Sequence, residues 1–422
     1  MTPASAPPSS RTPYAATAAF DSDAPWPRLL RRLPDRELGM LPIIAALVLI
    51  WAVFGIINPA FLSAENLVNL TLQSAPTGVI ALGVVLVLLV GQIDLSVGSV
   101  SGLAASVVAV TTVLWEWPIG LGILLALSVG VVVGLTYGLL ATRLGLPSFV
   151  LTLAGLLVLA GVQLRVLGSR GSINLPFESW LVSFAQQGFL SPVAAWTLVA
   201  GVVAVVAAVQ LVERSRRARA ELPRVSLARL LLRVGALAAL LSATVAYLGT
   251  ARGIGYPVVL FISLVAVVDV LLRRTRWGRS VRAVGGDRRS AMLVGVAVRR
   301  VTVSCFVACS TFAALGGVLA AGRLAAANQG TGGAETYLTA IAAAVIGGTS
   351  LFGGRGSAWS ALSLFGGRGS AWSALVGVLV ITSISSGLTL LNLDTASRYI
   401  VTGLVLVLAL TADTLLRAPR SR

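Results

Sequence analysis

The chain contains few side chains that could carry out bond chemistry. Cys305 and Cys309 lie four residues apart in an apolar stretch, so a helix would place both on one face. Two thiols alone make a poor metal site, and we interpret them as small buried apolar residues. The sequence contains no His, which excludes Ser-His-Asp and Cys-His nucleophiles and HExxH metal sites. We therefore predict no catalytic residue, no metal and no cofactor, and we do not expect an enzyme.

The basic residues exclude a further chemistry. All 32 of them are arginine. Without lysine there is no GxxxxGK[ST] phosphate-binding loop, so the chain does not hydrolyse ATP through a P-loop of its own. The formal net charge is +17, but the arginines stand in groups between apolar runs and form no basic stripe interleaved with aromatic residues. Nucleic acid is therefore not an expected partner.

Two acidic residues lie within or between apolar runs. Asp269 precedes Arg273 by four residues, which favours an ion pair on one helix face with a snorkelling arginine. Asp94 stands in the segment GQIDLSVG, which starts at Gly91 and has no arginine nearby. Lipid tolerates such a polar break where it caps a helix or lines a cavity. Two interpretations stay open: Asp94 or Ser96 is the N-cap of the following helix, or the break borders a translocation path.

The composition predicts the elements that must position these residues. Of 422 residues, 57% are hydrophobic and 11% are charged, whereas soluble domains carry about 25% charged residues. A membrane span needs about 20 apolar residues. The sequence predicts an all-α, polytopic transmembrane bundle of about twelve apolar segments, the second and tenth of which are short, interrupted by glycine, and candidates for broken or re-entrant helices. The segments begin near Leu41, Thr77, Leu95, Ile119, Pro147, Pro192, Leu230, Pro257, Val301, Tyr337, Ala374 and Arg398.

The arginines predict the orientation. They concentrate in alternate connections, which the positive-inside rule assigns to the cytoplasm together with both termini. We expect a disordered cytoplasmic tail over residues 1–37, rich in Ser, Thr, Pro and Ala, and a permease domain over 38–416. Cytoplasmic loops are expected at about 213–229 and 273–300, and a short cytoplasmic tail at 417–422.

Four stretches carry a resemblance to a known family. They are GQIDLSVGSVSGL from Gly91, LGLPSFVLTLAGL from Leu144, GGDRRSAMLVGVAVRR from Gly285 and AAAVIGGTSLFGGRGS from Ala342. Together they resemble, in the expected order, the membrane-spanning permeases of bacterial ABC importers for monosaccharides, the ribose/xylose/galactose group. The resemblance extends over about Leu41 to Leu415. An additional stretch over about 168–257, with two further apolar runs, is similar to the xylose-type members.

The resemblance implies a function and its partners. It implies a non-catalytic permease of the bacterial inner membrane that forms the path for a monosaccharide, a pentose such as D-xylose. Two copies would dock a cytoplasmic ATPase and a periplasmic or extracellular sugar-binding protein, with membrane lipid around them. The implied ATPase-coupling loop comprises Gly285, Gly286, Asp287, Arg288, Ala291 and Gly295, where a helix would place Ala291 and Gly295 on one face. Candidate residues of the path are Gln92, Asp94, Ser96, Phe149 and Thr152.

Two other classes of function compete with this interpretation. An ion-coupled secondary transporter needs ionisable residues along its path, and Asp94 is the single serious candidate. An intramembrane enzyme would need a base near its nucleophile, and none lies close in sequence. The chain also departs from the family at one place, because residues 350–362 recur unchanged as 363–375. We place the second copy in the loop between the tenth and eleventh spans.

Overall fold

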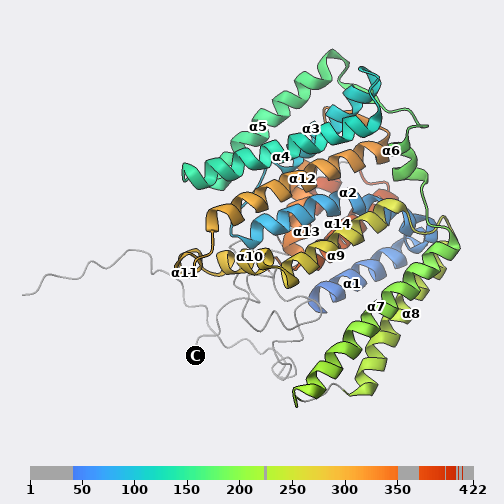
Figure 1. Ribbon diagram of the computed structural model, residues 1–422. Coiled ribbons are helices and arrows are strands. Elements are labelled where there is room, and N and C mark those ends of the chain that lie inside the picture. The colour runs from blue at the N-terminus through green and yellow to red at the C-terminus, as the bar shows by residue number, and fades with distance from the viewer. Residues whose placement is uncertain are drawn as a thin grey trace, which may run out of the picture.

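The computed structural model describes residues 41–222, 226–349, 370–394, 396–404, 407 and 411. In this part of the chain nearly all regular structure is α-helical, and the helices form a bundle (Figure 1). Eight helices are long and apolar enough to cross a membrane: α2 (Ala64–Leu89), α4 (Ile119–Arg143), α5 (Ser148–Leu167), α7 (Pro192–Arg219), α8 (Leu227–Gly249), α9 (Tyr256–Arg274), α12 (Val298–Leu324) and α14 (Ala371–Leu390). Three apolar helices are shorter: α1 (Leu41–Ile57), α3 (Val97–Val113) and α13 (Ala334–Ile346).

The predicted fold class, an all-α polytopic bundle, is confirmed. Eleven of the expected segments are helices, and residues 396–404 of the last segment are helical as well. The expected tails at residues 1–37 and 417–422 lie outside the described residues. The first copy of the tandem repeat lies outside them too. Residues 371–375, at the end of the second copy, form the first turn of α14, so our placement of the second copy in the loop was wrong for these last residues.

The prediction of the second segment was wrong. We expected a short span from near Thr77, interrupted by glycine, but α2 has 26 residues and runs unbroken through Pro76. We missed its start because its first turns are polar. The side chain of Ser63 caps these turns by accepting a hydrogen bond from the backbone N–H of Asn66 at 3.3 Å. The tenth segment is short as predicted, because α13 has 13 residues.

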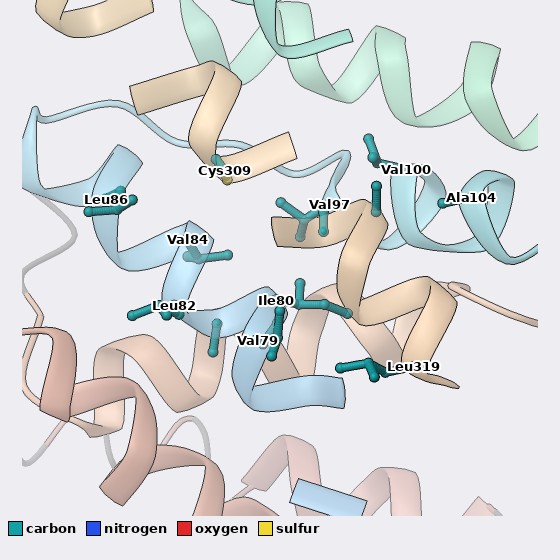
Figure 2. Packing of buried hydrophobic residues seen from close by; sticks show 14 of the residues in the cluster. Val79, Ile80, Leu82, Val84, Leu86, Val97, Val100, Ala104, Cys309 and Leu319 are labelled. Atoms are coloured by element: carbon teal, nitrogen blue, oxygen red, sulfur yellow. The ribbon is translucent and has the colours of Figure 1, made fainter. Parts of the chain in front are cut away.

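The centre of the bundle is α12, which packs against α2, α3 and α4. Figure 2 shows apolar side chains of α2 and α3 meeting Cys309 and Leu319 of α12. The α4–α12 seam is close because glycines face it: a Cβ atom at Gly134 would lie 2.5 Å from the carbonyl oxygen of Phe306. Small residues at such positions let two membrane helices approach closely. This seam fixes the ends of α4 and α12 relative to each other.

The two ends of the bundle carry different elements. At the C-terminal end of α12, β1 (Ser172–Asn174) and β2 (Ala326–Asn328) pair in antiparallel fashion, with Ile173 opposite Ala327. The short helix α6 (Trp180–Val182) packs against this end of α12. At the N-terminal end lie α10 (Arg276–Gly286) and α11 (Arg288–Leu293). The hairpin of α7 and α8, which accounts for the additional stretch, lies at the periphery (Figure 1).

Candidate functional sites: the Asp94 break and the segment before α12

The break between α2 and α3 is built by two local devices. Gly91 adopts φ +71° and closes α2, while the N–H groups of Gly91 and Gln92 bond to the carbonyls of Leu88 (3.0 Å) and Val87 (3.1 Å). This is the hydrogen-bond pattern of a Schellman motif, which favours glycine. Asp94 fixes the turn before α3: its Oδ1 accepts hydrogen bonds from the Ser96 backbone N–H (2.8 Å) and the Ser96 hydroxyl (2.7 Å).

Two hydroxyl groups at the start of α5 form hydrogen bonds to the backbone of the same break. The hydroxyl of Ser148 accepts a hydrogen bond from the N–H of Ile93 at 3.3 Å, and that of Thr152 accepts one from the N–H of Leu95 at 3.1 Å. Both donors are backbone groups that no helix satisfies at this point. The two motifs around Asp94 and Thr152, separate in sequence, therefore form one site.

Asp94 lies deep in this site. Its side chain is 2% exposed, and the Cys309 thiol and Tyr137 hydroxyl lie close to it. Its Oδ2 has no hydrogen-bond partner among the described residues. Ser96 is the N-cap residue of α3, which agrees with one of the two interpretations, but its side chain makes no capping hydrogen bond and donates to Asp94 instead. The path interpretation stays a prediction.

The five candidate residues of the path do not share one environment. Asp94, Ser96 and Thr152 are buried together. Gln92 is partly exposed, and Phe149 is 50% exposed. The five residues thus divide into a buried set and an exposed set, which meet at the start of α5.

The second site is the segment between α9 and α12. Here α10 lies with one face on the bundle, where Val281 and Val284 are buried and the indole of Trp277 donates to the Ser304 hydroxyl at 2.8 Å. Desolvation on this face lowers the pKa of Arg282, whose guanidinium donates to the carbonyl of Leu272. The helix α10 is thereby fixed to the membrane-spanning part and carries α11 with it.

Asp287 is the N-cap of α11, and its carboxylate, like that of Asp94, accepts the backbone N–H two residues later. Its Oδ1 accepts a hydrogen bond from the N–H of Arg289 at 2.9 Å, and its Oδ2 accepts one from the Ser290 hydroxyl. The Ser290 hydroxyl, followed by the N–H of Arg289, lowers the pKa of the Asp287 carboxyl. This carboxylate is exposed, as are the neighbouring Gly286 and Arg288, while Gly285 is partly buried.

The expected face of Ala291 and Gly295 was wrong. The helix ends at Leu293, and Gly295 follows it at φ +81°, with the N–H of Val296 bonded to the carbonyl of Ala291 at 3.0 Å. Gly295 is therefore the residue that terminates the helix. Ala291 is 3% exposed and belongs to the core of the bundle. Spacing of four predicts a shared face only while the helix continues, and here it does not.

The exposed side of α11 carries residues that our sequence reasoning missed. Met292, Leu293 and Val294 are 53%, 88% and 78% exposed and form an apolar tip next to the capped turn. A signal was present, since three consecutive apolar residues stand within an otherwise arginine-rich loop. A contiguous apolar patch on the surface is one of the features that mark contact sites for a partner protein.

Two smaller predictions are confirmed. The Arg273 Nε lies 2.8 Å from the Asp269 Oδ1, as an ion pair four residues apart on α9. Cys305 and Cys309 are both free and fully buried. Among the described residues no group of His, Cys, Asp and Glu is arranged to hold a metal ion.

The comparisons with known proteins decide the family. A family model described as the permease component of a branched-chain amino acid transport system matches residues 66–220 and 225–410. The chain belongs to this permease family. The comparisons also confirm the predicted resemblance, because the similar curated proteins include xylose, ribose and fructose permeases.

Three relatives place this permease within the family. The xylose transport system permease protein of Haemophilus influenzae is 32% identical over 91% of this chain and 98% of its own length. The ribose import permease of Bacillus subtilis is 29% identical, over 90% of this chain and 92% of its own. The fructose import permease of Rhizobium meliloti is 28% identical, over 95% and 92%. No solved structure matches the permease.

Proposed function

We propose that this permease forms the translocation path of an ABC importer for a pentose such as D-xylose in the bacterial inner membrane. The observation that carries the proposal is the similarity to a xylose permease at 32% identity over 91% of this chain and 98% of the relative. The additional α7–α8 hairpin agrees with it, since this stretch distinguishes the xylose-type pattern in the sequence. Identity to the ribose and fructose permeases is lower, at 29% and 28%.

The arginines support a cytoplasmic position for α10, α11 and both termini. The last turns of α7 and α9 each hold two or more arginines, and Arg143 ends α4. The helices α5 and α12, which run the other way, hold a single arginine in the last turn, Arg165 and Arg323. Arg-rich helix ends favour the cytoplasmic side. The β1–β2 sheet and α6 would then face the periplasm, where a sugar-binding protein delivers its cargo. A cysteine placed at Ser290 should be labelled by a membrane-impermeant maleimide only after the cells are opened.

The energy would come from a separate ATPase that docks on α11. The tip of Met292, Leu293 and Val294 is apolar, exposed and carried by a helix fixed at both ends. Burying it in a groove of the ATPase would remove its apolar surface from water, which favours association. Asp287 and Gly295 would define the length of the docking helix, and Ala291 would attach it to the bundle.

A matched pair of variants tests this docking site. Leu293→Glu places a charge at the tip, where the 88% exposed side chain leaves folding unaffected. We expect the variant to insert normally but to lose sugar-stimulated ATP hydrolysis. Leu222→Glu, at 56% exposure in the α7–α8 connection, is the control and should retain it. Normal stimulation in Leu293→Glu would exclude α11 as the docking element.

The sugar path would pass the exposed members of the Asp94 site. Gln92 and Phe149 are open to a solute, whereas Asp94, Ser96 and Thr152 would hold the break in place. Phe149→Ala should then raise the KM for sugar uptake, while Leu157→Ala, at 70% exposure further along α5, should leave it unchanged.

Reconstitution tests the function as a whole. Proteoliposomes that contain the permease, its ATPase and its sugar-binding protein should take up D-xylose when ATP is present, and the permease alone should take up none. Uptake that survives a protonophore and stops on ATP depletion would exclude an ion-coupled secondary transporter. Uptake by the permease alone would overturn the proposal.

A further inference from the structure

A groove with a basic mouth runs along the outside of the α4–α12 seam. Its volume is about 760 Å³, within the range of roughly 300–1,000 Å³ of ligand sites. Its apolar part is formed mainly by α12, with Leu139 from α4. The guanidinium groups of Arg143, Arg299 and Arg300 line the same groove. The proposed function uses neither the groove nor these arginines.

The three arginines gather at one end because the two helices run antiparallel. Gly138 of α4 packs on Val303 of α12, where a Cβ atom would lie 2.8 Å from the Val303 Cα. Arg143 follows this contact along α4, and Arg299 and Arg300 precede it along α12. All three therefore lie beyond the contact on the same side, at the mouth of the groove.

No acidic side chain among the described lining residues balances the charges of the mouth. The first turn of α12 contains no acidic residue, and its N-cap Ala297 has no side chain that could accept the free backbone N–H groups. The partial positive charge of a helix N-terminus adds to that of the arginines. The mouth thus favours a negatively charged group.

The apolar part has the dimensions of a lipid tail. The lining residues of α12 extend from Arg299 to Phe312. At about 1.5 Å per residue this is roughly 20 Å, somewhat more than the hydrocarbon depth of about 15 Å of one leaflet. The groove is partly open toward the surroundings of the bundle, where lipid lies. A soluble anion would leave this apolar stripe uncovered.

We propose that the groove binds an anionic phospholipid, with its phosphate at Arg143, Arg299 and Arg300 and an acyl chain along α12. Basic pockets between membrane helices are suited to anionic lipid headgroups. The lipid would hold the N-terminus of α12, which follows α11 directly in the chain. The proposal rests on membership in a membrane permease family and holds whichever sugar is carried.

Native mass spectrometry of the full-length permease in detergent, titrated with phosphatidylglycerol or phosphatidylcholine, tests the site. The parent should bind phosphatidylglycerol more tightly, and the triple variant R143Q/R299Q/R300Q should bind it on the order of a hundredfold more weakly. R229Q/R233Q removes two exposed arginines of α8 as the control and should retain the parent affinity. Ala308→Trp, which fills the apolar part without changing the charge, should also weaken binding.

The outcomes separate this occupant from others. Equal binding of both lipids, or equal losses in the triple variant and the control, would overturn the proposal. Displacement of the lipid by millimolar inorganic phosphate alone would assign the mouth to a free anion and overturn it as well. If the triple variant kept the lipid but lost the ATPase or its second copy, the groove would be a protein contact. If the triple variant did not fold, Ala308→Trp would decide.

Discussion

The break at Gly91–Ser96 and the segment Asp287–Gly295 use the same two local devices in opposite surroundings. Each contains an aspartate whose Oδ1 accepts the backbone N–H two residues later, at 2.8 Å for Asp94 and 2.9 Å for Asp287. Each contains a glycine at positive φ that closes a helix, Gly91 at +71° and Gly295 at +81°. Asp94 is 2% exposed in the core, whereas Asp287 is exposed.

The comparison shows how surroundings change the role of one motif. At the exposed segment water can replace every hydrogen bond of the cap, so the aspartate only biases the position of α11. At the break no water replaces the acceptor, because Ser96 is fully buried. A buried donor without an acceptor costs far more than the net gain of an average hydrogen bond. We therefore expect the effects of substitutions to follow burial rather than local hydrogen-bond pattern.

Asp94→Leu should have the largest effect. It leaves the buried N–H and hydroxyl of Ser96 without their acceptor, and each unsatisfied donor costs about 1–3 kcal/mol. The start of α3 should loosen, and both membrane level and sugar uptake should fall strongly. Immunoblots of membranes and uptake in whole cells measure this.

Asp94→Asn is the matched control for that variant. Its amide oxygen can still accept the N–H of Ser96, so membrane level should stay near that of the parent. If Asp94→Leu were expressed and transported like the parent, burial would not decide the role of the aspartate. The contrast between the two regions would then be wrong.

The sequence predicted the break at Gly91–Ser96 better than it predicted the segment Asp287–Gly295. The polar break in an apolar run identified Asp94 and Ser96, because a polar group within a membrane span costs free energy unless the protein satisfies its hydrogen bonds. The contact to Thr152 could not be predicted from spacing, since it joins residues 57 apart through the packing of α5 on the break. Around Ala291 the periodicity misled us because it does not reveal where a six-residue helix ends. The start of α2 at Ala64 was missed for a related reason, since polar residues are tolerated at the end of a span.

Asp287→Ala should have an intermediate effect, confined to coupling. Losing the cap lets the first turn of α11 fray, so the tip at Leu293 is held less firmly. Sugar-stimulated ATP hydrolysis should fall in part, while the thermal unfolding of the permease in detergent stays unchanged. Asp287→Asn keeps an acceptor and should restore most of the stimulation. A lower unfolding temperature in Asp287→Ala would show that the exposed cap supports the bundle after all.

The pH dependence of this cap follows from the lowered pKa of Asp287. A carboxyl whose folded pKa lies below its unfolded value contributes stability above the unfolded pKa and loses it as the pH falls through the folded pKa. The unfolded value is about 3.9, so the cap should be intact at every pH above about 5. Stimulated ATPase activity should therefore show no step from Asp287 near neutral pH. A step that disappears in Asp287→Asn would contradict this.

Asp269→Asn should have a small effect. It removes the ion pair with Arg273, but the two side chains are 17% and 29% exposed and lie near the end of α9. Pairs four residues apart on a helix contribute about 0.3–0.5 kcal/mol, and the asparagine oxygen can still accept a hydrogen bond. Uptake should remain near the parent level, well above that of Asp94→Leu. The reverse ranking of the two aspartates would move the functional centre from the break to α9.

Deletion of Ser363–Leu375 should have the smallest effect, although it removes thirteen residues. The removed segment includes Ser370, whose hydroxyl caps α14, and Ser373, whose hydroxyl lies 2.8 Å from that of Thr349. Residues 357–362 have the same sequence as 370–375, so after the deletion they can form the same first turn of α14 with the same contacts.

The shorter connection can still span the distance. Thr349 and Ser373 are in contact, and seven residues remain between Thr349 and Ser357, enough to cover roughly 25 Å. Shortening a loop changes its closure free energy by only about 0.6 kcal/mol for each halving. Membrane level and uptake should therefore match the parent, which immunoblots and sugar uptake would measure. A deletion that abolished both would show that thirteen residues of connection matter as much as one buried carboxylate, and the ranking by burial would fail.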